Sequence, residues 1–315
     1  MNQHTAVLLI GFGGPRGPEE VRPFLESVLE GVKIPESRLN EVLSHYEVMG
    51  GRSPYNEATE SQKAALEKEL KDRGAMLPVF VGYRHSTPSL SDAFTLIKKG
   101  GFQKVVGFVL SPLRSYASFG KYKERTEEGR KKAGASGIPV VYTAAFDRDP
   151  LFIEAVFQRL KEVLNGIPQK EMGRAFVLFS AHSIPMAMDA ESGYASQFEA
   201  IARHAAEKLS LANWGVAYQS RSGDPRDTWL SPDVNEAIRA VDPKKFTRIV
   251  LVPAGFLCDH VEVLYDLDIE AKKTAEKKGL LYSRSGTVTA HPAFIRMMAN
   301  RILPDSKPSG DDRSP

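Results

Sequence analysis

The stretch that decides the fold class is Arg174-Ala175-Phe176-Val177-Leu178-Phe179-Ser180-Ala181, which is followed at once by His182-Ser183-Ile184-Pro185. A short continuous apolar run that a turn-forming Ile-Pro pair closes is typical of a parallel strand buried on both faces. Ligands of parallel sheets gather beyond the carboxyl ends of the strands. The residues that follow each such run are therefore the first candidates for a functional site.

Seven further runs of this kind divide between the two halves of the chain. They cover residues 6–12, 77–83, 104–110 and 139–144 in the first half, and 214–219, 248–253 and 279–283 in the second. Segments with helical periodicity lie between them, at residues 57–73, 116–132, 194–209 and 259–276. Strands that alternate with helices in this way predict an α/β fold with doubly wound parallel sheets.

The length of 315 residues favours two domains with a cleft between them. We expect a first domain at 1–147, a second at 148–290 that carries the metal site, a C-terminal helix at 291–303 and a disordered tail at 304–315. A weak repeat supports two similar halves, because Asp149-Pro150-Leu151-Phe152-Ile153 resembles His291-Pro292-Ala293-Phe294-Ile295. Gene duplication or the general preference for proline at helix starts explains this match.

Composition excludes several classes of protein. Lys and Arg exceed Asp and Glu only by 42 to 39, and they are scattered, so no nucleic-acid partner is expected. The single cysteine, Cys258, excludes a disulfide within the chain and a cluster or structural zinc site that needs several thiolates from it. We interpret Cys258 as a small buried hydrophobe. No apolar run is long enough to cross a membrane, and we expect a soluble, cytoplasmic protein.

The glycine-rich loop after the first run does not predict a dinucleotide site. It reads Gly11-Phe12-Gly13-Gly14-Pro15-Arg16-Gly17, so the third glycine of a GxGxxG motif is replaced by Arg16. Pro15 also lacks the amide donor that a pyrophosphate would need. A close backbone approach to a flat ligand or a neighbouring element, or plain loop geometry, explains the glycines.

His182 and an acidic helix are the candidates for chemistry. A neutral imidazole can accept a proton or bind a divalent ion, although a histidine on an apolar strand is more often a core residue. On an α-helix Glu262, Asp266 and Glu270 would form one ridge, which is either a solvated face or a path for cations. Imidazole and carboxylate together suit a borderline ion such as Fe(II). His260, two residues before Glu262, is expected to point elsewhere and to be structural.

Four motifs of this sequence resemble those of the ferrochelatase family, whose members insert ferrous iron into a porphyrin late in heme synthesis. They are Ser180-Ala181-His182-Ser183-Ile184-Pro185, the pair Tyr218-Gln219-Ser220-Arg221 and Trp229-Leu230-Ser231-Pro232, the stretch from Val252 to Phe256 with Asp259-His260-Val261-Glu262-Val263-Leu264-Tyr265-Asp266-Leu267-Asp268, and Tyr46-Glu47-Val48-Met49-Gly50-Gly51-Arg52-Ser53-Pro54. The resemblance covers residues 6–303, and its most specific part surrounds Glu262.

The resemblance implies two similar Rossmann-like domains with the porphyrin between them, and a last helix that packs back on the first domain. It implies that His182 and Glu262 are the catalytic pair at the iron, with Asp266 and Glu270 as an acidic ridge leading away. Tyr46, Ser53 and Tyr122 match pocket positions of the family. Apolar walls and propionate partners complete the expected porphyrin-binding set: Phe12, Tyr46, Arg52, Ser53, Arg114, Tyr122, Ile184 and Trp229.

Two departures from coproporphyrin-using relatives favour protoporphyrin IX as the substrate and heme b as the product of this lyase. Phe12 replaces a tyrosine and Leu29 replaces a basic residue of those relatives. The alternatives are a coproporphyrin III ferrochelatase, a cobalt or nickel tetrapyrrole chelatase, and a non-catalytic heme- or metal-binding paralogue. We expect Fe(II) as a substrate, no prosthetic group and no iron-sulfur cluster. Weak peripheral association with membranes and a monomer or homodimer are compatible with the sequence.

Overall fold

The computed structural model of the chain describes residues 4–30, 36–221 and 227–303, and within them it contains two four-stranded parallel sheets. The strand orders are β2-β1-β3-β4 and β6-β5-β7-β8, so the two halves have the same topology. This confirms the predicted α/β class. The strands are β1 Thr5–Gly11, β2 Val79–Tyr83, β3 Lys104–Val109, β4 Val140–Tyr142, β5 Ala175–His182, β6 Trp214–Gln219, β7 Arg248–Val252 and β8 Leu281–Arg284.

The central strands are buried on both faces, which explains why their sequences are continuously apolar. Every residue of β1 is buried, and so are most of the residues of β5 and β7. Helices cover both sides of each sheet, so alternate residues of one strand enter different cores. All eight predicted runs are strands. His182 is the last residue of β5 and belongs to the strand, whereas we expected it just beyond.

Helices fill the connections between the strands. In the first half they are α1 Pro18–Val28, α2 Glu36–Val48, α3 Tyr55–Asp72, α4 Leu90–Lys99, the π-helix η1 Tyr116–Gly120 and α5 Lys121–Lys132. In the second half they are α6 Pro150–Leu164, α7 Gln169–Met172, α8 Met186–Ser192, α9 Tyr194–Lys208, α10 Val234–Ala240, α11 Val261–Val263, the π-helix η2 Leu264–Ala271, α12 Lys272–Lys277 and α13 Pro292–Ile302.

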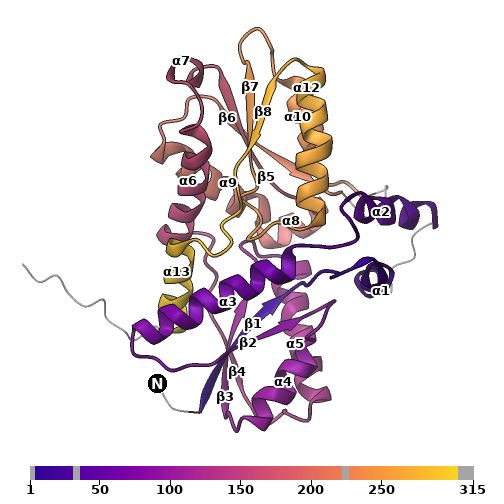
Figure 1. Cartoon of the computed structure of the whole chain (residues 1–315), viewed down its shortest axis with the longest axis vertical. Helices are drawn as coiled ribbons and strands as arrows, with labels where there is room; N and C mark the ends of the chain where they lie inside the picture. Colours follow the sequence, from indigo (N-terminus) through magenta and orange to yellow (C-terminus); the bar gives the residue numbers. More distant parts are fainter. Residues whose placement is uncertain (1–3, 31–35, 222–226, 304–315) are drawn as a thin grey trace, which may run out of the picture.

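The two halves form two lobes stacked along the long axis of the molecule (Figure 1). The helices that follow the last strand of each sheet pack on the other lobe: α6, which follows β4, packs on α9, and α13, which follows β8, packs on α3 as well as on α6. The two repeated Pro-containing motifs begin these two helices. Phe146, Phe152 and Phe294 join one continuous core that contains residues of both lobes, with Phe146 and Phe152 ring centroids 5.3 Å apart. This shared core fixes the position of one lobe relative to the other.

The helical segment predicted at residues 259–276 differs from a regular α-helix. It begins with the single turn α11, continues as the π-helix η2 and ends as α12. π-Helical turns are rare, and those that occur are often found at functional sites. We predicted a ridge of Glu262, Asp266 and Glu270 from α-helical spacing. Because Asp266 and Glu270 lie on a π-helix, the three side chains are not spaced one α-helical turn apart along one face. The sequence analysis missed this because it assumed α-helical geometry, with about 3.6 residues per turn, along the whole segment.

Among the described residues, no helix combines the length and the apolar character that crossing a membrane requires. The predicted tail at 304–315 lies outside the described residues.

Candidate active site

A cavity of about 390 Å³ lies at the junction of the two lobes and takes its lining from both. The first lobe contributes Phe12 after β1, residues of α1 and α2, and the loop from Leu110 to Ser118. The second contributes His182 at the end of β5 and the segment from Gly255 to Glu262 after β7. These residues follow the carboxyl ends of parallel strands, where ligands of such sheets bind.

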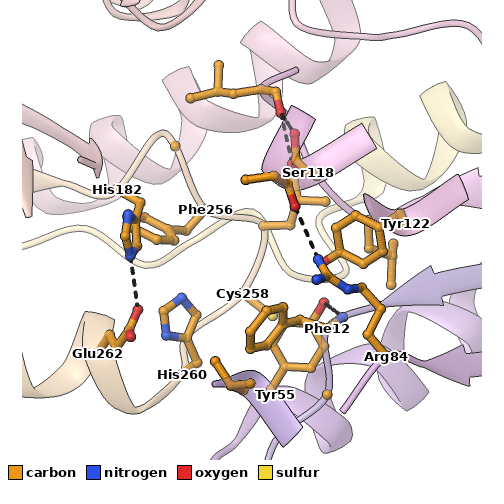
Figure 2. A pocket seen from close by; sticks show the side chains of 18 of the residues that line it. Phe12, Tyr55, Arg84, Ser118, Tyr122, His182, Phe256, Cys258, His260 and Glu262 are labelled. Atoms are coloured by element: carbon orange, nitrogen blue, oxygen red, sulfur yellow. Dashed lines mark hydrogen bonds and ion pairs between the residues drawn. The ribbon is translucent and has the colours of Figure 1, made fainter. Parts of the chain in front are cut away.

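His182 presents one ring nitrogen to the cavity. Its Nδ1 lies 2.6 Å from the carbonyl oxygen of Ser183, which only accepts hydrogen bonds, so Nδ1 carries the proton and donates it. In the neutral imidazole the lone pair is then on Nε2, which faces Glu262 (Figure 2). Tyr194 also donates its hydroxyl to the carbonyl oxygen of His182, at 3.0 Å. The strand and these two bonds therefore orient Nε2 as a proton acceptor or metal ligand.

Glu262 lies next to His182 in the cavity wall. The distance from His182 Nε2 to Glu262 Oε2 is 3.6 Å, and the side chains are 32% and 45% exposed, so both remain accessible to a ligand. Gly255 makes this approach possible because its amide donates to Ser180 and a Cβ at this position would lie 2.4 Å from that of Ala181. Among the described residues there is no cluster of three or more His, Cys, Asp or Glu side chains able to hold a metal ion.

His260 lines the same cavity, and our expectation that it points elsewhere is wrong. The expectation assumed helical spacing between His260 and Glu262. His260 instead has an extended backbone, with φ of −147°, and precedes the first helical residue. Burial lowers the pKa of His260, although Glu262 acts in the opposite direction. The ring lies beside Glu262 in Figure 2, and its neutral form predominates at neutral pH.

The structure brings most of the expected porphyrin-binding residues together. Among the cavity-lining residues are Phe12, Tyr46, Ser53, Tyr122 and Ile184. Three others do not line the cavity. Arg52 pairs with Glu57 at the surface, the guanidinium of Arg114 is 3.7 Å from the carboxylate of Asp147, and Trp229 forms a bridge with Pro185. Their side-chain directions depend on packing, which the motif match did not reveal.

Arg84 is a cavity residue that sequence analysis missed. It follows β2 directly, and its guanidinium carbon lies 4.9 Å from the centroid of the Tyr122 ring. Its Nη1 donates to the carbonyl oxygen of Ala117, and burial lowers its pKa, yet no carboxylate of the described residues pairs with it. In Figure 2 Arg84 and Tyr122 lie on the side opposite His182 and Glu262. Applying the strand-end rule to β2 would have identified it.

The first glycine-rich loop approaches neighbouring polypeptide. Gly13 has φ of +91°, and a Cβ there would lie 2.5 Å from Cβ of Ser86. A Cβ on Gly14 would lie 2.7 Å from Cβ of Ser53, which lines the cavity. The glycines thus allow close packing between β1 and the cavity wall, one of the two uses that we considered.

Asp266 and Glu270 are on η2 but do not line the cavity. Asp266 accepts hydrogen bonds from Ser220 Oγ and from Gln219 Nε2, the latter at 3.1 Å. Burial raises the pKa of Asp266 from 3.8 to about 7, opposed by the hydrogen bond from Ser220 and reinforced by the charge of Glu262. Glu270 is exposed. The carboxylate nearest to Glu262 on this ridge is therefore partly protonated at neutral pH.

Substitution of Asp266 by Asn is expected to change the pH dependence of stability. Because the folded-state pKa is raised, the folded protein keeps a proton that the unfolded chain releases, and wild-type stability falls between about pH 4 and about pH 7. The neutral amide removes this loss. The variant should therefore gain stability relative to wild type as pH rises, measured by urea unfolding at several pH values. Glu276→Gln, an exposed carboxylate on the same helical segment, is the control. A constant difference between Asp266→Asn and wild type at all pH values would contradict the raised pKa.

The sequence model described as Ferrochelatase matches residues 4–305. A protein of Rhodopirellula baltica named ferrochelatase is 36% identical over 301 residues, covering 95% of this chain and 85% of that protein. A protein of Tropheryma whipplei named coproporphyrin III ferrochelatase is 36% identical over 321 residues, covering 96% and 82%. Relatives from Leifsonia xyli and Nocardia farcinica, 36% and 35% identical, carry that same name.

Solved structures with the same fold include chelatases. The sirohydrochlorin chelatase SirB of Bacillus subtilis, determined with Fe³⁺, superposes with a TM-score of 0.59 at 14% identity and covers 95% of this chain and 94% of that one. The chelatase-like multidomain protein DR2241 of Deinococcus radiodurans gives a TM-score of 0.59 at 16% identity, covering 95% and 55%. At these identities the likeness concerns the fold alone.

Proposed function

Because this chain belongs to the ferrochelatase family, we propose that it inserts ferrous iron into a porphyrin bound in the cavity between the lobes, with His182 and Glu262 as the catalytic pair. The observation that carries the assignment of residues is the 3.6 Å approach of His182 Nε2 to Glu262 Oε2 inside a largely apolar cavity. A flat aromatic ligand requires such walls, and a metal requires such a pair of ligands.

The insertion of iron into a porphyrin exchanges protons for a metal ion. Fe(II) replaces two protons on the pyrrole nitrogens, and both protons are lost to acceptors. Nε2 of His182 has a lone pair directed into the cavity because Nδ1 is the donor to Ser183, so it can take a pyrrole proton. Glu262, with its Oε2 3.6 Å from Nε2 of His182, supplies a negative charge and an oxygen ligand beside the imidazole, which replaces water around the incoming ion. His260, neutral and adjacent, is available as a second proton acceptor.

Coproporphyrin III is the substrate that we favour, although the sequence alone favoured protoporphyrin IX. The change rests on the relatives, since several at 35–36% identity are named coproporphyrin III ferrochelatase. Both porphyrins carry propionates, and coproporphyrin has more of them. Arg84, partly buried and without a carboxylate partner among the described residues, supplies a positive charge for one propionate. Ser53, Ser115 and Ser118 also line the cavity.

Protoporphyrin IX remains the second candidate because the first lobe is apolar at two positions where some relatives are polar. The Phe12 ring lines the cavity and lies 6.0 Å from that of Phe24. Leu29 is partly buried and packs against the same apolar cluster. Vinyl groups, which replace two propionates in protoporphyrin IX, are compatible with such a surface.

One assay tests both the function and the substrate. Purified protein is incubated anaerobically with Fe(II) and either coproporphyrin III or protoporphyrin IX, and the loss of free porphyrin is followed optically. We expect turnover with both and a higher kcat/KM for coproporphyrin III. A higher kcat/KM for protoporphyrin IX would reverse the substrate assignment. Absence of turnover with either, combined with tight porphyrin binding, would indicate a non-catalytic binding protein. Turnover with Co(II) on sirohydrochlorin alone would indicate the other chelatase branch.

A further inference from the structure

The segment that carries Glu262 has little local stabilisation of its own. Its N-cap, His260, makes no side-chain hydrogen bond to the helix start, and α11 has only three residues before the π-helix η2 begins. An uncapped start leaves amide donors without side-chain partners, and π-helix is a rare form that is found mostly as single turns within α-helices. The position of the Glu262 carboxylate therefore depends on contacts from outside the segment.

Arg284 makes those contacts. It is the last residue of β8, its side chain is 13% exposed, and its guanidinium binds two carboxylates at once. Nε and Nη2 donate to Oδ1 and Oδ2 of Asp268 at 2.7 and 2.9 Å. Nη1 and Nη2 donate to Oδ1 and Oδ2 of Asp259 at 3.0 and 3.1 Å. Both interactions are bidentate, which is the geometry that only a planar guanidinium provides.

The two carboxylates flank Glu262 in the sequence. Asp259 lies in the extended segment before α11, and Asp268 lies on η2. Arg284 itself is held by pairing of β8 with β7, where it is opposite Leu251. The hydroxyl of Tyr282, two residues earlier on β8, donates to the carbonyl oxygen of Leu267 at 2.6 Å. One sheet edge thus fixes the segment before Glu262 and the segment after it.

We propose that Arg284 is a positioning residue, which holds both flanks of the Glu262 segment so that the Glu262 carboxylate faces His182. The expected effect of Arg284 on turnover rests on the proposed function, whereas its expected effect on the position of Glu262 does not. Arg284 does not line the cavity, so it acts through Glu262 rather than on the substrate. Lysine at this position keeps the charge but has a single nitrogen, which cannot bind both carboxylates in this way.

The test compares Arg284→Lys with Arg301→Lys. Arg301 is a matched control because its guanidinium also forms a partly buried ion pair, with Nε and Nη2 3.2 and 2.8 Å from Asp149 Oδ2, and it does not line the cavity. A displacement of about 1 Å in a catalytic group can reduce turnover by about 100-fold. We expect a loss of that order in kcat/KM for Fe(II) in Arg284→Lys, while the Kd for porphyrin, measured by fluorescence, stays close to that of wild type. Arg301→Lys should lose stability without this loss of turnover.

A crystal structure of Arg284→Lys gives a readout that does not depend on activity. We expect the Glu262 carboxylate to move away from Nε2 of His182. If Arg284→Lys does not fold, Asp268→Asn, which leaves Asp259 paired with Arg284, is compared in the same assays. Should Glu262 keep its place, or should Arg284→Lys and Arg301→Lys lose turnover equally, the proposal is overturned. Failure of the wild-type protein to insert iron would instead refute the proposed function, and the crystal structure would still decide the role of Arg284.

Discussion

Replacement of His182 by alanine is expected to reduce iron insertion by about 100-fold to 10,000-fold, the usual contribution of a positioned proton acceptor. The imidazole of His182 lies next to Glu262 in the cavity, whereas the backbone oxygen of His182 accepts a hydrogen bond from Tyr194. The truncation removes the Nε2 lone pair and leaves β5 intact. Initial rates of Fe(II) insertion at saturating porphyrin measure the effect.

His204→Ala is the matched control for this substitution. His204 lies on the exposed face of α9, its Nδ1 is 2.6 Å from the carbonyl oxygen of Ala200, and it does not line the cavity. Its rate should equal that of wild type. Porphyrin binding by His182→Ala should also be retained, because the apolar walls remain. A wild-type rate in His182→Ala would show that this residue has no catalytic role.

Replacement of Glu262 by glutamine is expected to lower turnover by about 100-fold or more, since the amide keeps the shape of the side chain and removes its charge. If Glu262 supplies an oxygen ligand to the incoming ion, KM for Fe(II) rises together with the loss of kcat. The same change should also lower the pKa of Tyr46, which burial and the Glu262 carboxylate both raise. Steady-state kinetics with Fe(II) varied at fixed porphyrin give both parameters.

Glu276→Gln provides the comparison, because Glu276 is exposed on α12, the continuation of the same helical segment. It should leave kcat and KM unchanged. Equal behaviour of Glu262→Gln and Glu276→Gln would remove Glu262 from the catalytic pair. An unchanged KM for Fe(II) with a strongly reduced kcat would assign Glu262 to proton removal and leave metal binding to His182.

The strands and the residues that end them could be predicted because their signal is local. A run such as residues 175–181, in which Ser180 is the one polar residue, stays almost wholly apolar only when both faces are covered, so sequence alone identified a parallel strand and placed His182 at its carboxyl end. Glu262 was identified first as part of the acidic helix that follows the run at 248–253, and the motif resemblance then implied its role. The same strand-end reasoning also applies to Arg84 after β2, and it was overlooked because no motif drew attention to it.

Other features depend on the backbone that a segment adopts once it is packed. His260 was expected to point away because helical spacing was assumed, and the extended residue before α11 reverses that direction. The acidic ridge was drawn on an α-helix, but η2 changes the spacing and Asp266 binds Ser220 and Gln219 of β6 and its following turn. Arg52 and Arg114 are adjacent in sequence to residues that line the cavity. Each nevertheless pairs with a carboxylate that does not line it.

By itself, the sequence determined the fold class, the order of strands and helices and the pair of residues that we propose as catalytic, because apolar patterning and motifs are properties of neighbouring positions. Only the tertiary structure decided that His182 Nε2 and Glu262 Oε2 are 3.6 Å apart, that Arg84 faces the cavity, and that Arg284 joins Asp259 to Asp268. Each of these arrangements brings together segments that are distant in the chain. Their separation is set by how two lobes and a sheet edge pack, and no local pattern records that packing.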